Sequence, residues 1–220
     1  LEQRPLIQPQ IPQAFRGRLI SENFAGQEGG YFLRIGEGLL RNDTKYSNEN
    51  ILAWLEETES MALKENEGPL VLIYHTHATE SFERYDSEYY DTRNTWRSTD
   101  NNNNMVAVGA AMAHALEQAG IGVIHDTTQH DYPSYNGSYE RSAETIQQYL
   151  EQYPSIKIIL DLHRDAMERE NQTIVKPVVE IDGRKAAQIM IIAGADNGSM
   201  GMEHWKQNMR FACDFQNAME

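Results

Sequence analysis

From residue 69 onward, short apolar runs alternate with stretches whose apolar residues recur at helical spacing, and this alternation constrains the fold more than any other feature. The apolar runs cover 71–74, 121–124 and 156–160, and the stretches between them cover 105–119 and 139–152. Strands that alternate with amphipathic helices are typical of a parallel sheet covered by helices. We therefore predict an α/β fold with a largely parallel central sheet flanked by helices.

The N-terminal third lacks this pattern. Residues 1–18 are rich in Gln and Pro and predict a poorly ordered arm, while 19–50 hold many turn residues. A short strand at 31–33 and a helix at 49–61 fit within this part. We predict a small irregular N-terminal subregion at 1–68 and a main domain at 69–220. A hairpin around Asp182-Gly183-Arg184, with strands at 173–181 and 187–193, and a helix at 202–219 complete the main domain.

Composition excludes several classes of protein. The net charge is −14, which repels phosphate backbones, so we expect no nucleic-acid partner. Cys213 is the single cysteine, so an intrachain disulfide is impossible and any metal site must use nitrogen and oxygen ligands. The sequence contains no stretch of about 18 consecutive apolar residues, which a membrane-spanning helix requires. The sequence begins with Leu1 rather than Met, which indicates trimming, so the lack of a targeting or anchoring segment in it proves little.

Two polar clusters directly follow predicted strands. The first stands in HTHATE after the run 71–74, and the second stands in DLHRD after the run 156–160. Because functional groups collect beyond the carboxyl ends of strands in such sheets, the two clusters converge if their strands are neighbours. Their polar members are His75, His77, Glu80, Asp161, His163, Arg164 and Asp165.

Two histidines and one glutamate suit a catalytic zinc ion, which takes three protein ligands and keeps one position open. Asp161 or Asp165 would orient a ligating imidazole. Arg164 would pair with Asp165 or meet a substrate carboxylate. Each cluster alone has an ordinary alternative: the paired histidines as loop residues, and DLHRD as a structural ion-pair cluster.

The other histidines offer weaker candidates. His114 lies within a helical pattern and is expected to be structural. His204 lies near a helix start and is expected to be exposed to solvent. His125 and His130 are ambiguous, because they follow a predicted strand but stand beside aspartates that form turns. Neither a phosphate-binding loop, nor a dinucleotide-binding glycine pattern, nor a serine nucleophile elbow is present.

Several stretches together resemble stage II sporulation protein P, a family of bacterial peptidoglycan hydrolases. They are VLIYHTHATESF, RSTDNNNNMVAVG, VIHDTTQHDYPSYNGSYERS and SIKIILDLHRDA, continued by GADN and HWKQNMRFA. The resemblance covers about residues 69–212, and the combination is much more specific than any one stretch.

The resemblance implies an amidase-like fold and a relation to zinc-dependent N-acetylmuramoyl-L-alanine amidases, which cut the amide between the glycan and the stem peptide. Endopeptidase activity on peptide cross-links is also implied. The family acts in engulfment of the forespore, with sporulation protein D, a lytic transglycosylase, and sporulation protein M as partners. It implies an extracytoplasmic domain at the sporulation septum and engulfing membrane, anchored by a transmembrane helix that would lie before Leu1.

The resemblance also assigns residues. The position of the first zinc histidine in the amidases matches His77, and that of the last matches His163. Their glutamate ligand matches a point near Asn101, so Glu80 is expected to replace it. His75 is expected to act in catalysis, as a hydrogen-bond donor to the intermediate or as a fourth ligand that swings away. Arg164 is expected to bind a stem-peptide carboxylate.

One departure from the amidases concerns catalysis. They carry a catalytic glutamate on a C-terminal strand, and no residue here matches it, so the general base is expected beyond Glu220 or is lacking. The chain as given would then bind zinc poorly or hydrolyse slowly. Two rivals stay open: a catalytically impaired cell-wall binding or scaffolding domain, and an unrelated metallohydrolase with further acidic ligands such as Asp196.

Overall fold

The computed structural model describes residues 10–26, 29–36, 38–62, 68–83, 87–196 and 201–219. The chain forms two compact units, and each is assembled from two separate stretches. The first unit comprises Leu1–Ile20 and Leu63–Val175, and the second comprises Ser21–Ala62 and Lys176–Glu220. These units are defined by contacts in space, and the predicted division of the chain into 1–68 and 69–220 stays a prediction.

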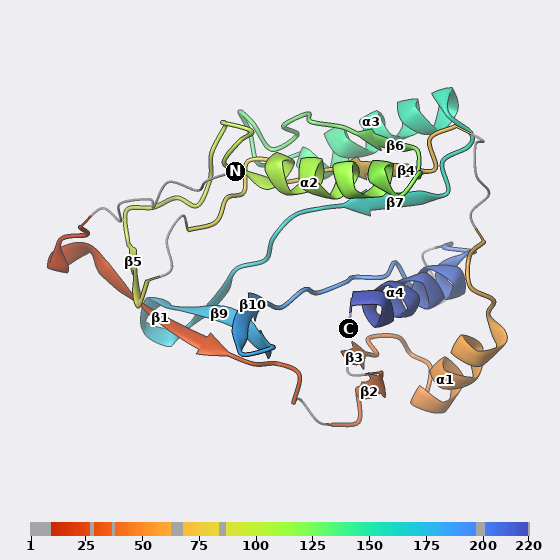
Figure 1. The fold of residues 1–220 in the computed structure, drawn as a ribbon, viewed down its shortest axis with the longest axis horizontal. Helices are drawn as coiled ribbons and strands as arrows, with labels where there is room; N and C mark the ends of the chain where they lie inside the picture. Colours follow the sequence, from red (N-terminus) through yellow and green to blue (C-terminus); the bar gives the residue numbers. More distant parts are fainter. Residues whose placement is uncertain are drawn as a thin grey trace. The chain divides into compact units, whose positions relative to one another are not determined.

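A three-stranded parallel sheet forms the centre of the first unit (Figure 1). Its strand order is β6-β4-β7, so the strand that precedes HTHATE lies in the middle, directly beside the strand that precedes DLHRD. The predicted α/β fold with a parallel sheet is confirmed. The strands are β4 (Val71–Tyr74), β6 (Val123–His125) and β7 (Ile158–Asp161), and the helices between them are α2 (Met105–Gln118) and α3 (Ser138–Gln152).

Helices α2 and α3 cover the two faces of this sheet. Gly109 of α2 packs closely against His75, while Ser142 of α3 lies with its Oγ 3.1 Å from the Oγ1 of Thr76. His75 and Thr76 are consecutive and extend β4, so their side chains point to opposite faces. Central strands covered on both sides are apolar throughout, which explains why Leu72 and Ile73 are fully buried.

The ends of α2 follow from its sequence. Asn104 caps the start, where its side-chain oxygen accepts a hydrogen bond of 3.0 Å from the backbone N–H of Val106. Gly120, with φ of +80°, follows the end of the helix. The predicted helices at 105–119 and 139–152 are confirmed. Among the described residues, no helix is both long and apolar enough to cross a membrane.

Two antiparallel pairings lie within the first unit. Strand β1 (Arg16–Glu22) pairs through residues 16–18 with β5 (Tyr89–Asp91), and β8 (Met167–Arg169) pairs with the first three residues of β9 (Thr173–Ile181), whose remainder belongs to the second unit. The predicted N-terminal arm is therefore wrong from residue 16 onward, and residues 1–9 lie outside the described part. The sequence rule failed because β1 is held by partners distant in sequence: Gly17 lies directly under the ring of Tyr90. Short 3-10 turns stand at Gln13–Phe15 (η1) and Glu170–Gln172 (η2).

The second unit has its own core between two helices and a hairpin. Its elements are β2 (Phe32–Ile35), β3 (Gly38–Arg41), α1 (Asn48–Glu57), β9 from Lys176 onward, β10 (Arg184–Ala187) and α4 (Trp205–Met219). The buried core residues are Ile51, Leu55, Trp205, Met209 and Cys213. Trp205 stacks on Tyr46 at 5.7 Å and meets Trp54 edge-on at 5.3 Å, so aromatic contacts join α1 to α4.

The predicted hairpin is present, but its second strand lies earlier than expected. Asp182 and Gly183 both have positive φ, 51° and 73°, as a two-residue turn requires. Strand β10 therefore begins at Arg184 and ends at Ala187, and the prediction of a strand over 187–193 is wrong. The run from Ile189 to Ile192 is apolar but follows the end of β10, although the register would place it opposite residues 173–176 of β9, and Ile192 is 78% exposed.

Candidate functional site

Two hydrogen bonds tie together the loops that follow β4 and β7. The Asp161 carboxylate accepts from the backbone N–H of Thr76 at 2.9 Å. The Nδ1 of His75 donates to the carbonyl of Leu162 at 2.7 Å. These two bonds link the end of β4 to the end of β7, so they fix the distance between the loop that follows β4 and the loop that follows β7. This arrangement brings HTHATE and DLHRD together, as the spacing of the strands predicts.

His77, Glu80 and His163 lie next to one another at this edge. The rings of His77 and His163 have centroids 5.6 Å apart, and the Nδ1 of His163 is 3.8 Å from Oε2 of Glu80. Glu80 is buried; its Oε2 accepts from the backbone N–H of Arg164 at 3.0 Å, and its Oε1 is 3.8 Å from Arg97. Within the described ranges, no three His, Cys, Asp or Glu side chains are grouped closely enough to hold a metal ion. Zinc binding stays a prediction.

Aromatic side chains surround His77. Its ring stacks on Tyr135 at 4.7 Å with an interplanar angle of 14°, and Tyr139 meets it edge-on at 5.3 Å. Its Nε2 is 3.4 Å from the Tyr135 hydroxyl and its Nδ1 is 3.5 Å from the Ser138 hydroxyl. Burial lowers the pKa of His77, which favours the neutral imidazole that binds metals. Burial and the nearby Asp161 carboxylate raise the pKa of Tyr139.

A buried carboxylate that no sequence pattern indicates, Asp131, holds the loop that contains HTHATE. Asp131 accepts from the N–H of Thr79 at 3.1 Å and from its hydroxyl at 2.6 Å. Arg97 completes the group with a hydrogen bond of 2.7 Å to the same carboxylate. In the sequence Asp131 resembles a turn former, and only the strand order shows that it faces HTHATE. This network fixes the backbone on which His77 and Glu80 stand.

His75 is not brought to His77 and His163 but lies on the α2 side of the sheet. It is fully buried, and its Nε2 is 2.9 Å from the Nε2 of His125. Since Nδ1 carries the proton given to Leu162, the Nε2 of a neutral His75 accepts, and His125 donates. Burial lowers the pKa of both histidines. The predicted catalytic role of His75 stays a prediction, while the structure shows it joining two loops.

His125 and His130, whose roles were ambiguous in the sequence, both contact His75. The Nδ1 of His130 donates to the carbonyl of His75 at 2.9 Å, and its Nε2 is 3.8 Å from Oδ2 of Asp126. That oxygen of Asp126 is buried and has no hydrogen-bond partner among the described residues. His130 and His125 therefore support the loop after β4 from beneath.

The remaining candidates lie apart from the three grouped residues or are engaged elsewhere. The guanidinium of Arg164 donates to the carbonyls of Ser81 and Trp96, each at 3.2 Å, so it holds the loops around Glu80. Its predicted role in binding a substrate carboxylate stays a prediction. Asp165 accepts from the N–H of Ala166, and Asp196, in the second unit, accepts from the N–H of Met202.

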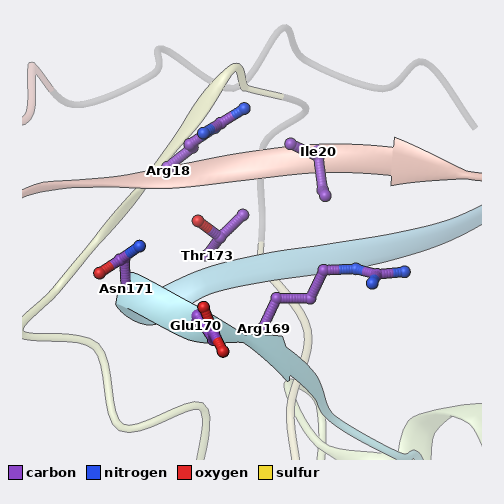
Figure 2. A pocket seen from close by; sticks show the side chains of 6 residues that line it. All are labelled: Arg18, Ile20, Arg169, Glu170, Asn171 and Thr173. Carbon is purple, nitrogen blue, oxygen red and sulfur yellow. The ribbon is translucent and has the colours of Figure 1, made fainter.

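A separate cavity of about 530 Å³ lies elsewhere in the first unit. Figure 2 shows that its polar side chains do not converge: the guanidinium groups of Arg18 and Arg169 extend to different places and Glu170 points away from both. A binding site for a small molecule needs polar groups that meet at one point. The lining residues are Arg18, Ile20, Arg169, Glu170, Asn171 and Thr173.

Comparison with known proteins gives a consistent result. The family model of stage II sporulation protein P matches residues 37–220. The curated relative "Stage II sporulation protein P" of Bacillus subtilis (strain 168) is 26% identical over 157 residues, which are 69% of this chain and 36% of that protein. The chain thus spans about a third of the length of that relative. No solved structure matches. Since the family model covers most of the chain, including both loops of the candidate site, the chain belongs to the stage II sporulation protein P family, a family of sporulation proteins.

Proposed function

We propose that the chain is a zinc-dependent peptidoglycan hydrolase that cleaves the amide between N-acetylmuramic acid and the stem peptide, with peptide cross-links as further substrates, during engulfment in sporulation. The observation that carries the proposal is the approach of His77, Glu80 and His163 at the carboxyl edge of the parallel sheet. The three come from two loops far apart in the sequence. Their meeting in a family of sporulation proteins supports a common chemical task.

The donor chemistry of these three residues fits zinc. Imidazole nitrogen and carboxylate oxygen bind zinc at about 2.0–2.2 Å, and two ligands of a tetrahedral ion therefore lie roughly 3.3 Å apart. The 3.8 Å between the His163 nitrogen and the Glu80 oxygen is close to that separation. We propose that His77, Glu80 and His163 hold zinc, which when bound would acidify a water molecule and polarise the carbonyl of the amide.

The surrounding residues orient the proposed ligands. The backbone N–H of Arg164 donates to the Glu80 carboxylate and the guanidinium of Arg97 faces it, so both hold this carboxylate in position. Asp131 fixes the loop between His77 and Glu80 through Thr79. Such contacts hold ligands in place before the metal arrives, which lowers the cost of ordering them on binding. Arg164 is proposed to recognise a stem-peptide carboxylate when its contacts with loop carbonyls are exchanged.

The proposal extends to location and partners. In it the chain acts outside the cytoplasmic membrane, at the sporulation septum and engulfing membrane, with an anchor that precedes Leu1. It works on peptidoglycan beside sporulation protein D and sporulation protein M. The net charge of −14 would repel the phosphates of nucleic acid but would not repel a neutral glycan.

A second candidate is a cell-wall binding or scaffolding domain without catalysis. The observation that favours it is that no three metal-binding side chains are grouped closely enough within the described ranges. Such a domain would keep the fold and the exposed tyrosines at the edge of the sheet and lose hydrolysis.

Mass spectrometry of digested peptidoglycan separates the two candidates. We expect the wild-type chain with added zinc to release free stem peptides slowly, because no residue of it matches the catalytic glutamate of the amidases, and to leave the glycan intact. The His163→Ala variant should release none, while His114→Ala, which changes an exposed histidine on α2, should act as wild type. Fragments shortened only within the peptide would contradict the amidase proposal and indicate endopeptidase action. No cleavage by any variant would favour the binding domain.

A further inference from the structure

Two tyrosines at the candidate site are exposed although both contact a buried histidine. Tyr135 and Tyr139 are 52% and 61% exposed, whereas His77 between them is 3% exposed. Large aromatic side chains normally stabilise a fold by being buried, and these two leave much of that surface in water. Their exposure therefore does not follow from packing, and their position beside His77 points to a ligand.

Tyr139 is the better placed of the two. The stacked ring of His77 and the guanidinium of Arg97, 4.8 Å from the ring centre, both lie over faces of Tyr135. Tyr139 instead meets His77 with an interplanar angle of 87°, so the contact involves a ring edge. Among the described residues no cation and no second ring is recorded against Tyr139, and the residue is 61% exposed, so a face of its ring is open to solvent beside the proposed zinc ligand.

The backbone of Tyr139 is firmly held. It lies in the first turn of α3, next to Ser138, which is 2% exposed and contacts His77. The hydroxyl of Ser142, also 2% exposed, donates to the Tyr139 carbonyl at 3.0 Å. A ring on a rigid backbone loses little freedom when a ligand docks against it, which favours binding.

The chemistry around the ring selects a neutral ligand with an apolar face. Three carboxylates, Glu80, Asp131 and Asp161, lie in the loops around His77. Arg97 is paired with Asp131. An anionic peptide would meet this negative charge, whereas the C–H face of a sugar ring can pack on the tyrosine without any charge.

We propose that Tyr139 forms a carbohydrate subsite that binds a sugar ring of the glycan strand, on the glycan side of the amide to be cut. The substrate in this statement rests on the proposed function, but the subsite itself is defined by the exposed ring beside His77. Tyr135 borders the subsite and presents its hydroxyl to His77. The role of Tyr139 is to fix the register of the glycan relative to His77 and His163.

Calorimetric binding to two separate ligands tests this subsite: uncharged glycan fragments, for which oligomers of N-acetylglucosamine serve, and the free stem peptide. Tyr139→Ala should weaken glycan binding roughly threefold to tenfold, as expected for the loss of one aromatic contact. Tyr139→Phe should bind nearly as wild type, because it keeps the ring. Tyr132→Ala is the matched control, since Tyr132 is 59% exposed in the loop that precedes α3 and should leave binding unchanged.

The outcomes separate this inference from the proposed function. Glycan binding that is absent in wild type, or unaltered in Tyr139→Ala, overturns the subsite. A loss confined to the stem peptide overturns it too and assigns the ring to the peptide side. Tyr139-dependent glycan binding by a chain that neither holds zinc nor releases stem peptides would support the subsite and contradict the hydrolase. Circular dichroism of each variant verifies that the fold is retained.

Discussion

His75 and His125 share one hydrogen bond, and that bond determines where the proton sits on each ring. The carbonyl of Leu162 accepts from Nδ1 of His75, which leaves Nε2 of His75 to accept from His125. His75 must be neutral for this chain of bonds to exist, because a protonated His75 would place two N–H groups face to face. Since Leu162 adjoins His163, the pair supports the proposed zinc site from below.

This pair predicts a dependence of stability on pH. Burial lowers the pKa of His75 and His125 below the ordinary value of 6.5, so below about pH 6.5 the unfolded chain takes up protons that the folded chain does not. Their contribution to stability is present above this pH and is lost as the pH falls toward the folded pKa. His125→Gln, whose amide can still donate to His75, should therefore lose less stability on acidification than wild type.

Urea denaturation at about pH 7.5 and pH 5.5 measures this difference. His114→Gln serves as the control, because it changes an exposed histidine and should keep the pH response of wild type. An unchanged response in His125→Gln would show that the buried pair does not titrate as described.

Gly109 gives a second prediction at the residue scale. A Cβ there would lie 2.5 Å from Nε2 of His125 and 2.6 Å from Nε2 of His75, so even alanine forces the pair apart. We expect Gly109→Ala to lower the free energy of unfolding by about 1–3 kcal/mol despite the better helix propensity of alanine. Gly26→Ala, with no atom near its Cβ, is the control. Thermal or urea denaturation of both variants measures the effect. Equal stability of Gly109→Ala and wild type would contradict the close contact between Gly109 and the two histidines.

The position of residues that follow a strand could be predicted from the sequence. The contacts of the residues that hold those loops in place could not. His77, Glu80 and His163 stand directly after apolar runs, and that position is visible in one sequence. The pairing of Asp131 with Arg97 and of His75 with His125 depends on which loops become neighbours in space. No local pattern carries that information, because the partners are distant along the chain.

At the scale of secondary structure, α2 depends on an asparagine in a run of four. Asn104 is buried; it caps the helix and donates to the carbonyl of Ser98 at 2.9 Å, which ties the helix to the loop before it. Asn104→Ala should lower the free energy of unfolding by about 1–2 kcal/mol, measured by urea denaturation. Asn102→Ala, at an exposed position two residues earlier, should change it by less than about 0.5 kcal/mol. Equal effects of the two substitutions would rule out the assigned cap.

The helices and the parallel strands could be predicted from hydrophobic periodicity and from capping residues. The antiparallel strands were predicted less accurately. The helices α2 and α3 lie within a residue of their expected bounds. Strand β1 was missed because a short polar strand such as RGRLISE is defined by its partners rather than by its composition. The expected strand at 187–193 was misplaced because the two-residue turn at Asp182 starts β10 at Arg184, and pairing ends at Ala187, one residue before the position opposite Pro177, which has no N–H to donate.

At the scale of the whole molecule, one sheet edge gathers the residues that bear chemistry. The second unit has a separate aromatic core, and the proposed ligands all belong to the first unit. The family match covers elements of both units, from residue 37 to residue 220. Membership in a sporulation family and the site in the first unit together support the proposed hydrolase, whose central claim is that two loops of one sheet share a zinc ion.

Zinc content of the purified chain tests that claim most directly. After equilibration with zinc and removal of the excess, elemental analysis should find about one zinc per chain in wild type and in the exposed-histidine control His114→Ala. His77→Ala and His163→Ala should each lose it while they remain folded by circular dichroism. If both variants keep the zinc content of wild type, or if wild type itself holds none, the proposed zinc site at HTHATE and DLHRD is wrong.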